Sequence, residues 1–263
     1  MHYPRAPLLS AVSPATLPAL YEATNYGFLF ASVFHPRMRF VSPIRKVLPH
    51  PTIFNLLGPL TSPVTASLEA RLIGVRHHSL GASFADALRS QGARKALVVC
   101  GEEELDEISC AGRTRCWMLK TGDAGGDAGK DVVPFVEVDH FWLHPSDFGL
   151  GAHALSTVAS GHGPMENAEM LRRILEGELA DDDPVVEFVL LNAAALFVVS
   201  GICEADSSAM GPGDDGVVVM ERGPGGQRWK EGVRRARWAI RSGEAWRQWQ
   251  AFVDATHRLA EGE

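Results

Sequence analysis

The sequence contains little of what marks several common classes of protein. Its 263 residues include four cysteines, which form neither a CxxC pair nor a metal-ligand spacing, so a disulfide scaffold and a zinc module are not indicated. We expect buried thiols in a reducing compartment at these positions, Cys100, Cys110, Cys116 and Cys203. Basic residues are outnumbered by acidic ones. The formal net charge of −7 gives no support for binding to nucleic acid or to anionic lipid.

Long hydrophobic runs are also missing from the sequence. The most apolar stretch, Phe188 to Ile202, is shorter than the roughly 20 residues that a bilayer helix needs, and it carries Asn192 near its middle. We interpret it as a buried helix. The first residues show neither the apolar core of a signal peptide nor the pattern of a transit peptide. We therefore expect a cytoplasmic protein with no membrane partner.

The composition that remains is typical of a globular protein. Hydrophobic residues make up 46% of the chain and charged residues 22%, which excludes wholesale disorder. The length allows one large domain or two small ones. Between Phe28 and Pro63 the chain is apolar but rich in proline, which predicts short helices joined by fixed turns.

A strand, a helix and a second strand follow this proline-rich part. Arg71 to Val75 reads as a short strand, a helix capped by Ser79 ends at Gly92, and Ala96 to Cys100 is an apolar strand. A crossover of this length makes the two strands parallel, which predicts an α/β protein whose sheet is covered by helices.

Further strands and helices are expected along the rest of the chain. Strands are predicted near Cys116 to Leu119 and near Val132 to Val138. Apolar spacing predicts helices over Met165 to Leu175, Val185 to Ser200, and in two segments around Val233 to Ile240 and Trp246 to Leu259. Two glycine-rich inserts, Gly122 to Gly129 and Gly211 to Gly226, are interpreted as mobile surface loops.

An acidic cluster stands where an α/β sheet places its ligands. The strand that ends at Cys100 leads directly into five carboxylates, those of Glu102, Glu103, Glu104, Asp106 and Glu107. Ligands in open α/β sheets bind beyond the carboxyl ends of strands, and hard oxygen donors suit Mg²⁺ with substrate phosphates. The alternative is a solvated acidic loop without a ligand.

A cationic segment contrasts with the acidic remainder. Residues 35–46 carry His35 and four Arg or Lys side chains, which could hold an anion. A guanidinium matches a carboxylate in bidentate geometry, and such a bond contributes about 1.5 to 3 kcal/mol. The alternative is an exposed basic turn that pairs with the protein's own surplus of acids.

Taken in order, several segments resemble the anthranilate phosphoribosyltransferase family. The most specific are Thr52-Ile53-Phe54-Asn55-Leu56-Leu57-Gly58-Pro59-Leu60-Thr61 and Leu105-Asp106-Glu107-Ile108-Ser109. The supporting segments are Gly27 to Ala31, His35-Pro36, Pro43-Ile44-Arg45, Leu72 to Val75, Asp147 to Leu150 and Glu166-Asn167-Ala168. The later part of the chain is similar to the fungal form of the enzyme.

The resemblance implies a function. The family transfers the 5-phosphoribosyl group from phosphoribosyl pyrophosphate to anthranilate in tryptophan biosynthesis and releases pyrophosphate with Mg²⁺. By position, Arg45 matches the arginine that receives the anthranilate carboxylate, and the residues that line that pocket match His35, Gly58 and Pro59. Asp106 and Glu107 match the carboxylates that hold Mg²⁺.

The resemblance also implies an architecture. We expect the α/β core of the nucleoside phosphorylase and phosphoribosyltransferase type, with a parallel-rich sheet flanked by helices and the remnant of a helical subdomain. Residues 1–65 are predicted to form the partial helical subdomain with the anthranilate-binding segment, and residues 66–263 the α/β catalytic domain. The intact enzyme of this family is a possible homodimer.

One departure from the family leaves two hypotheses open. Family members carry a Gly-Thr-Gly-Gly-Asp phosphate loop and a Lys-His-Gly-Asn stretch ahead of the matching region, and neither occurs in this sequence. The chain is expected to correspond to the carboxyl-terminal two thirds of the enzyme. It is either an active phosphoribosyltransferase or a catalytically inactive fragment that binds without turnover. A pyrimidine nucleoside phosphorylase is disfavoured by the Leu105 to Ser109 and Arg45 contexts.

Overall fold

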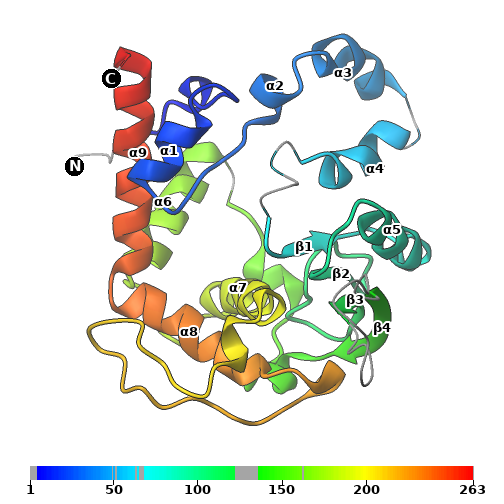
Figure 1. Ribbon diagram of the computed structural model, residues 1–263, viewed down its shortest axis with the longest axis vertical. Coiled ribbons are helices and arrows are strands. Elements are labelled where there is room, and N and C mark those ends of the chain that lie inside the picture. The colour runs from blue at the N-terminus through cyan, green and yellow to red at the C-terminus, as the bar shows by residue number, and fades with distance from the viewer. Residues whose placement is uncertain are drawn as a thin grey trace, which may run out of the picture. The chain divides into compact units, whose positions relative to one another are not determined.

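The computed structural model describes residues 5–48, 50, 52–62, 64, 68–121, 136–161 and 163–262 (Figure 1). The chain divides into two compact units. The first comprises Met1–Thr65 together with Gly243–Glu263, and the second comprises Ala66–Ser242.

A mixed four-stranded sheet forms the centre of the second unit. The strands are β1 (Arg71–Gly74), β2 (Ala96–Gly101), β3 (Thr114–Thr121) and β4 (Val136–Leu143), in that spatial order. β1 and β2 are parallel, as the sequence predicts, whereas β2–β3 and β3–β4 are antiparallel. The expected majority of parallel pairings is therefore not seen among the described strands. The physical reason is that β2 and β3 are joined by a loop with no crossover helix, so the chain reverses.

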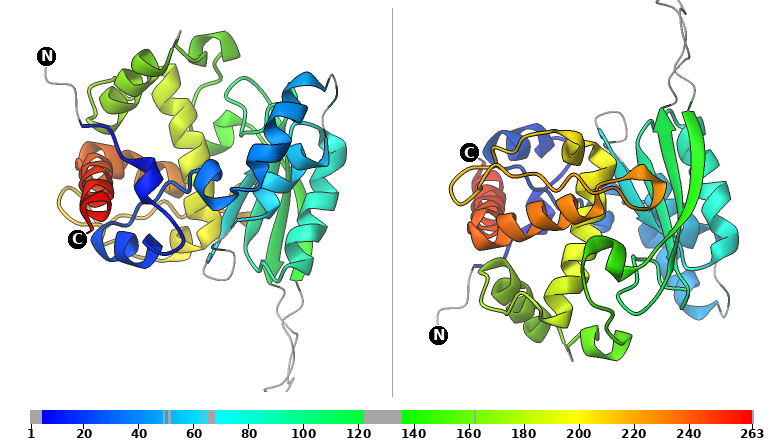
Figure 2. Two further views of the ribbon diagram at one scale, coloured as in Figure 1. Left: turned by 90° about the horizontal axis from the view of Figure 1, so that it is seen from above. Right: turned by 90° about the horizontal axis from the view of Figure 1, so that it is seen from below.

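Helices cover both faces of this sheet, which confirms the α/β class (Figure 2). On one face lies α5 (His78–Ser90), which approaches closely because a Cβ on Gly81 would come within 2.3 Å of the Trp117 ring. Its N-cap is His77, which accepts the Ser79 N–H, rather than Ser79 itself. On the opposite face lies α7 (Pro184–Ser200), with α8 (Trp229–Arg241) packed against it.

The helix α7 is the core of the second unit. Asp183 caps its start by accepting the Val185 N–H at 2.9 Å, and Gly201 ends it with φ 92°. Many side chains of the helix are buried in the main core, and they include Leu190, Leu191, Ala194 and Val198. The predicted buried helix is thus confirmed. Within the part of the chain described, no helix has the length and apolar character needed to span a bilayer.

The first unit is helical, and its helices are short apart from the last one. α1 (Leu17–Ala23) packs against the last helix, α9 (Glu244–Glu261), and their core contains Val12, Leu20, Phe252 and Ala255. This apolar contact groups residues 243–263 with the first unit, whereas the sequence analysis placed them with the second segment. The remaining helices are α2 (Ala31–Phe34), α3 (Met38–Val47) and α4 (Ile53–Leu60). Both α3 and α4 contain a proline and are short, as expected.

The second glycine-rich insert is anchored by buried charges. Glu231 of α8 has no exposed surface, bonds Arg234 and Arg235 at 2.7 Å each, and accepts the Val219 N–H at 3.0 Å. Asp214 of the insert accepts from Arg234 at 2.8 Å. These contacts anchor the segment at Asp214 and Val219, and the mobility expected for residues 211–226 stays a prediction. The other insert, over 122–129, lies outside the described residues.

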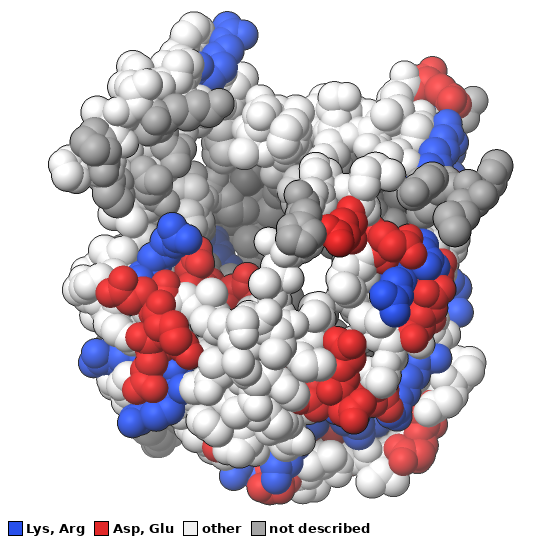
Figure 3. All heavy atoms as spheres, turned by 180° about the vertical axis from the view of Figure 1, so that it is seen from behind, with Lys and Arg blue, Asp and Glu red and all other residues white. Residues whose placement is uncertain are grey.

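The side of the molecule shown in Figure 3 carries mixed charge. Acidic and basic side chains lie next to one another there, and the described residues form no extended surface of one sign on that side. The helix α6 (Pro164–Leu175) illustrates this, since Arg172 pairs with Glu169 at 2.8 Å and with Glu178 at 2.8 Å.

We predict that Glu231→Gln lowers the free energy of unfolding by about 3 kcal/mol, because it leaves the buried Arg235 guanidinium without a counter-charge. Burial raises the pKa of Glu231, but the hydrogen bonds from Arg234 and the Val219 N–H, together with the charges of Arg234 and Arg235, outweigh it, so the pKa lies below its usual value. The stabilisation is then present above the unfolded-state pKa and lost as the pH falls through the folded one. Urea unfolding against pH measures both effects.

Glu221→Gln is the matched control. Its carboxylate pairs with Lys230 at 2.7 Å on the surface, where a salt bridge contributes about 0 to 1 kcal/mol. Equal losses in the two variants would contradict a structural role for the buried network.

Candidate active site

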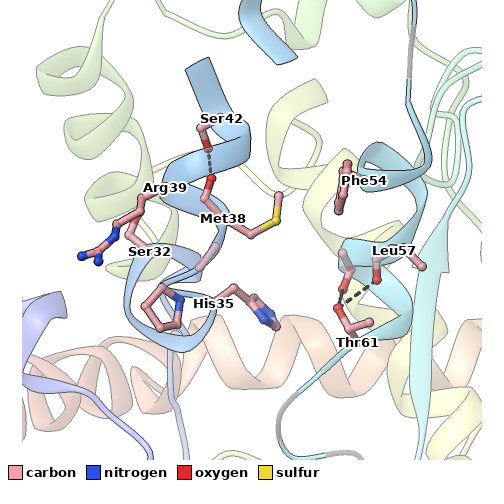
Figure 4. Close-up of a pocket in the computed structure, with 11 residues that line it drawn as sticks. Ser32, His35, Met38, Arg39, Ser42, Phe54, Leu57 and Thr61 are labelled. Carbon is pink, nitrogen blue, oxygen red and sulfur yellow. Dashed lines mark hydrogen bonds between the residues drawn. The ribbon is translucent and has the colours of Figure 1, made fainter. Parts of the chain in front are cut away.

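A pocket of about 520 Å³ lies in the first unit between α2 and α3 on one side and α4 on the other (Figure 4). Its volume falls within the range of small-molecule sites. The apolar part of the wall includes Met38, Phe54 and Leu57, and in Figure 4 Met38 points across the cavity toward Phe54. This wall suits a flat aromatic ring.

Polar groups stand at defined points of the same wall. Ser42 donates to the Met38 carbonyl at 2.9 Å and Thr61 to the Leu57 carbonyl at 3.0 Å, so each hydroxyl oxygen is left as an acceptor. The His35 imidazole points toward α4 in Figure 4. The pocket therefore offers apolar contact with a few directed polar groups.

The structure brings two of the predicted anthranilate-binding residues to this pocket. His35 and Gly58 both line it. Pro59 lies in α4, next to Gly58, and is exposed. Arg45 lies in α3, three positions after the lining residue Ser42, but its side chain is outside the described part of the chain. The role assigned to Arg45 remains a prediction.

Arg39 is a lining residue that the sequence analysis did not single out. Its guanidinium lies 4.7 Å from the centre of the Phe40 ring and points away from α4 in Figure 4. It is thus held by a cation–π contact outside the cavity. The cationic character of the segment alone could not separate Arg39 from Arg45.

The acidic loop belongs to the second unit and follows β2. It closes on itself: the Gly101 N–H donates to the Leu105 carbonyl at 2.8 Å, and the Glu102 N–H donates to the Arg113 carbonyl at 2.9 Å. Glu104 has φ 61°, a left-handed conformation that costs an L-residue roughly 1 to 2 kcal/mol. The loop is therefore compact and locally strained.

Three of the five carboxylates, those of Glu102, Glu103 and Glu104, contact polar side chains in or near the loop. The Ser109 hydroxyl donates to Glu103 at 3.0 Å. Looser ion pairs join Glu102 to Arg113 at 4.0 Å and Glu104 to His77 at 3.5 Å. The sequence could not separate these three acids from the two assigned to a metal.

Asp106 and Glu107 differ in their contacts. The exposed Asp106 carboxylate lies 3.9 Å from the Arg76 guanidinium, a contact about as long as that between Glu102 and Arg113. Within the described part of the chain no Lys, Arg or His nitrogen lies within 4.0 Å of the Glu107 carboxylate. Burial and the charge of Asp106 raise the pKa of Glu107. The pair is thus a donor set that a divalent cation would neutralise.

The donor chemistry fits Mg²⁺. Both side chains supply hard oxygens, and Mg²⁺ is commonly bound by one or two carboxylates, with phosphates and water completing the octahedron. No group of three or more His, Cys, Asp or Glu among the described residues is arranged to hold a metal ion. The two carboxylates would therefore need a phosphate ligand to complete a site.

The comparisons with known proteins show the family of the chain. The family model described as "Glycosyl transferase family, a/b domain" matches residues 10–246. The chain belongs to this family. Within it, the chain is 38% identical over 241 residues to the anthranilate phosphoribosyltransferase of Schizosaccharomyces pombe, covering 92% of this chain and 57% of that protein. The corresponding enzyme of Saccharomyces cerevisiae is 34% identical, with 94% and 57% covered.

Solved structures of the same family agree with the fold. The Saccharomyces cerevisiae anthranilate phosphoribosyltransferase in complex with PRPP and Mg matches with a TM-score of 0.76 at 33% identity, covering 96% of this chain and 60% of that one. The complex of that enzyme with 4-fluoroanthranilate matches with a TM-score of 0.75 at 34% identity, with 95% and 60% covered. The predicted resemblance is confirmed. The chain spans 57–60% of the length of these relatives.

We predict that Gly74→Ala displaces the loop at Asp106. A Cβ on Gly74 would lie 1.6 Å from the Asp106 carbonyl oxygen, so the backbone must move. Overpacking of this kind costs about 1 to 3 kcal/mol of unfolding free energy. Denaturant unfolding and the amide chemical shifts of residues 105–109 measure the effect.

Gly112→Ala in the same loop is the control, since a Cβ at this position would lie 3.5 Å from the nearest atom, Glu103 Oε1, which is an ordinary van der Waals contact. If the two variants behaved alike, the close approach of Asp106 to β1 would be refuted.

We predict that Glu104→Gly stabilises the protein by up to about 1 kcal/mol, because glycine removes the left-handed strain. Glu104→Ala removes the same exposed contact with His77 but keeps a Cβ, so we expect no gain from it. Thermal unfolding compares the two variants. A gain from alanine equal to that from glycine would attribute the effect to charge instead of backbone conformation.

Proposed function

We propose that this chain transfers the 5-phosphoribosyl group from phosphoribosyl pyrophosphate to the amino group of anthranilate, giving N-(5-phosphoribosyl)anthranilate and pyrophosphate in tryptophan biosynthesis. The observation that carries the proposal is the 33–34% identity, over 95–96% of this chain, to yeast enzyme structures that hold PRPP with Mg or 4-fluoroanthranilate. We also propose a cytoplasmic location, and a homodimer for the intact enzyme.

The apolar pocket is the proposed place for the aromatic acid. His35, Gly58 and Pro59 would line it, and the Arg45 guanidinium would receive the carboxylate in a bidentate bond. The ring would lie between Met38 and Phe54, which are both on the pocket wall. These contacts would fix the amino group toward the sugar.

Asp106 and Glu107 would hold Mg²⁺ bound to the diphosphate. When bound, the metal would neutralise charge on the departing pyrophosphate. In the reaction the anthranilate nitrogen forms a bond to C1 of the ribose while the bond from C1 to the pyrophosphate oxygen breaks, and the nitrogen loses a proton. The protein needs no nucleophile of its own, because positioning and charge stabilisation supply the rate enhancement.

A second candidate function is binding without turnover. It is favoured by one observation, namely that the chain spans 57–60% of the length of its relatives. In that case the chain would engage anthranilate but would not complete the transfer.

The fluorescence of anthranilate separates the two candidates. The chain is mixed with anthranilate, Mg²⁺ and phosphoribosyl pyrophosphate, and the loss of anthranilate emission is followed. One control contains a chelator that removes Mg²⁺, and the other omits phosphoribosyl pyrophosphate. Loss that requires both additions supports the transferase. Binding without loss supports the second candidate, and neither binding nor loss contradicts both.

We predict that Arg45→Ala weakens anthranilate binding by about 1.5 to 3 kcal/mol, the contribution of a charged hydrogen bond. Direct fluorescence titration of anthranilate measures the dissociation constant. Arg39→Ala is the control, because its guanidinium points away from α4, and it should leave the constant nearly unchanged. The opposite ranking of the two variants would move the carboxylate site to Arg39.

A further inference from the structure

Asn192 of the apolar helix α7 forms hydrogen bonds to the acidic loop. The Asn192 Oδ1 accepts the Ile108 N–H at 3.0 Å, and the Asn192 Nδ2 donates to the Ile108 carbonyl at 3.4 Å and to the Phe188 carbonyl at 3.2 Å. The side-chain amide therefore pairs with both backbone groups of one residue, as a neighbouring strand would.

This pairing answers a specific need of the fold. Ile108 has no exposed surface, so its backbone N–H and carbonyl lie away from water at a point beyond the end of β2. Unpaired buried backbone groups cost about 1 to 3 kcal/mol each. Among the uncharged side chains, a primary amide offers both a donor and an acceptor at the spacing of a peptide.

The position of Ile108 makes the contact more than a local one. Ile108 directly follows Glu107, so fixing its backbone fixes the direction of the Glu107 Cα–Cβ bond. Its other neighbour is also held: the Ser109 N–H donates to the Thr114 hydroxyl at 2.8 Å, and the Ser109 hydroxyl accepts the Ala111 N–H at 3.0 Å. Asn192 provides hydrogen bonds by which α7 also holds this part of the loop.

The helix that carries Asn192 is itself rigidly placed. Leu190 and Leu191, which lie between Phe188 and Asn192 in the chain, are each 1% exposed and belong to the main core. A side chain on such a helix is a fixed reference for the loop.

We propose that Asn192 is a positioning residue for the metal-binding carboxylates: by holding the peptide groups of Ile108 it keeps Asp106 and Glu107 in the arrangement that binds a divalent cation. The inference rests on the proposed function in one respect, the assignment of Asp106 and Glu107 to the metal. Residues that orient metal ligands typically contribute 10–100-fold to metal affinity.

Three variants and two measurements test it. Asn192→Leu keeps the branched shape and the number of side-chain heavy atoms and removes all three hydrogen bonds, and Asn192→Asp keeps the acceptor for the Ile108 N–H. Leu196→Ala changes an exposed residue of the same helix and is the control. If Asn192→Leu does not fold, Asn192→Ser, which is too short to reach both groups, replaces it with the same expected results.

The first measurement is amide hydrogen exchange at Ile108 without metal. We expect exchange to be about tenfold faster in Asn192→Leu, the effect of one lost hydrogen bond, and close to wild type in Asn192→Asp and Leu196→Ala. Unchanged exchange in Asn192→Leu would overturn the inference whatever the function of the chain is.

The second measurement uses Mn²⁺ with inorganic pyrophosphate and follows paramagnetic broadening of the Asp106 and Glu107 amide signals. We expect the Mn²⁺ dissociation constant to rise about tenfold in Asn192→Leu, to return toward wild type in Asn192→Asp, and to be unchanged in Leu196→Ala. Faster exchange with unchanged Mn²⁺ affinity would reduce Asn192 to a purely structural residue and overturn the proposal. No broadening in the wild-type protein would instead refute the metal assignment itself, and the positioning role with it.

Discussion

Backbone contacts to β1, to α7 and within the loop itself hold the two adjacent carboxylates of Asp106 and Glu107 together in this protein. The loop after β2 closes through the Gly101–Leu105 hydrogen bond, passes within contact of Gly74 in β1, and is paired at Ile108 with Asn192 of α7. Asp106 and Glu107 therefore keep two like charges next to each other in the chain, and burial, followed by the charge of Asp106, raises the pKa of Glu107. A divalent cation would relieve the repulsion between these two carboxylates. We therefore assign the proposed metal site to this loop and not to the acidic composition as a whole.

The pocket of the first unit follows from a different constraint. The helices α3 and α4 are short, each contains a proline, and their facing side chains enclose a cavity of about 520 Å³. Its wall is apolar with hydroxyl and imidazole groups at the edges. Such a wall suits an aromatic ring, and we propose that Arg45 of α3 receives the carboxylate. Each unit thus carries one of the two candidate sites.

Much of the fold could be predicted from local pattern. The β1–α5–β2 unit, α6 and α7 follow from apolar spacing and from glycines just past the helix ends. The antiparallel course of β3 and β4 could not, because strand direction depends on how a loop returns. The anchoring of residues 211–226 was also hidden, since glycine content indicates a free loop and the buried Glu231 that ties it down lies in another element. For the site, the sequence placed five carboxylates in one loop but could not show that the Ser109 hydroxyl donates a hydrogen bond to Glu103. Asn192 was visible as a polar residue in an apolar helix, yet only its partner Ile108 gives it a role.

The most direct test of the central claim is anomalous diffraction from crystals of the protein soaked with Mn²⁺ and inorganic pyrophosphate. The account predicts a manganese peak at bonding distance, about 2 Å, from carboxylate oxygens of Asp106 and Glu107, with pyrophosphate oxygens completing the coordination. A peak at Glu102, Glu103 or Glu104, or an ordered pyrophosphate with no manganese at Asp106 and Glu107, would contradict it.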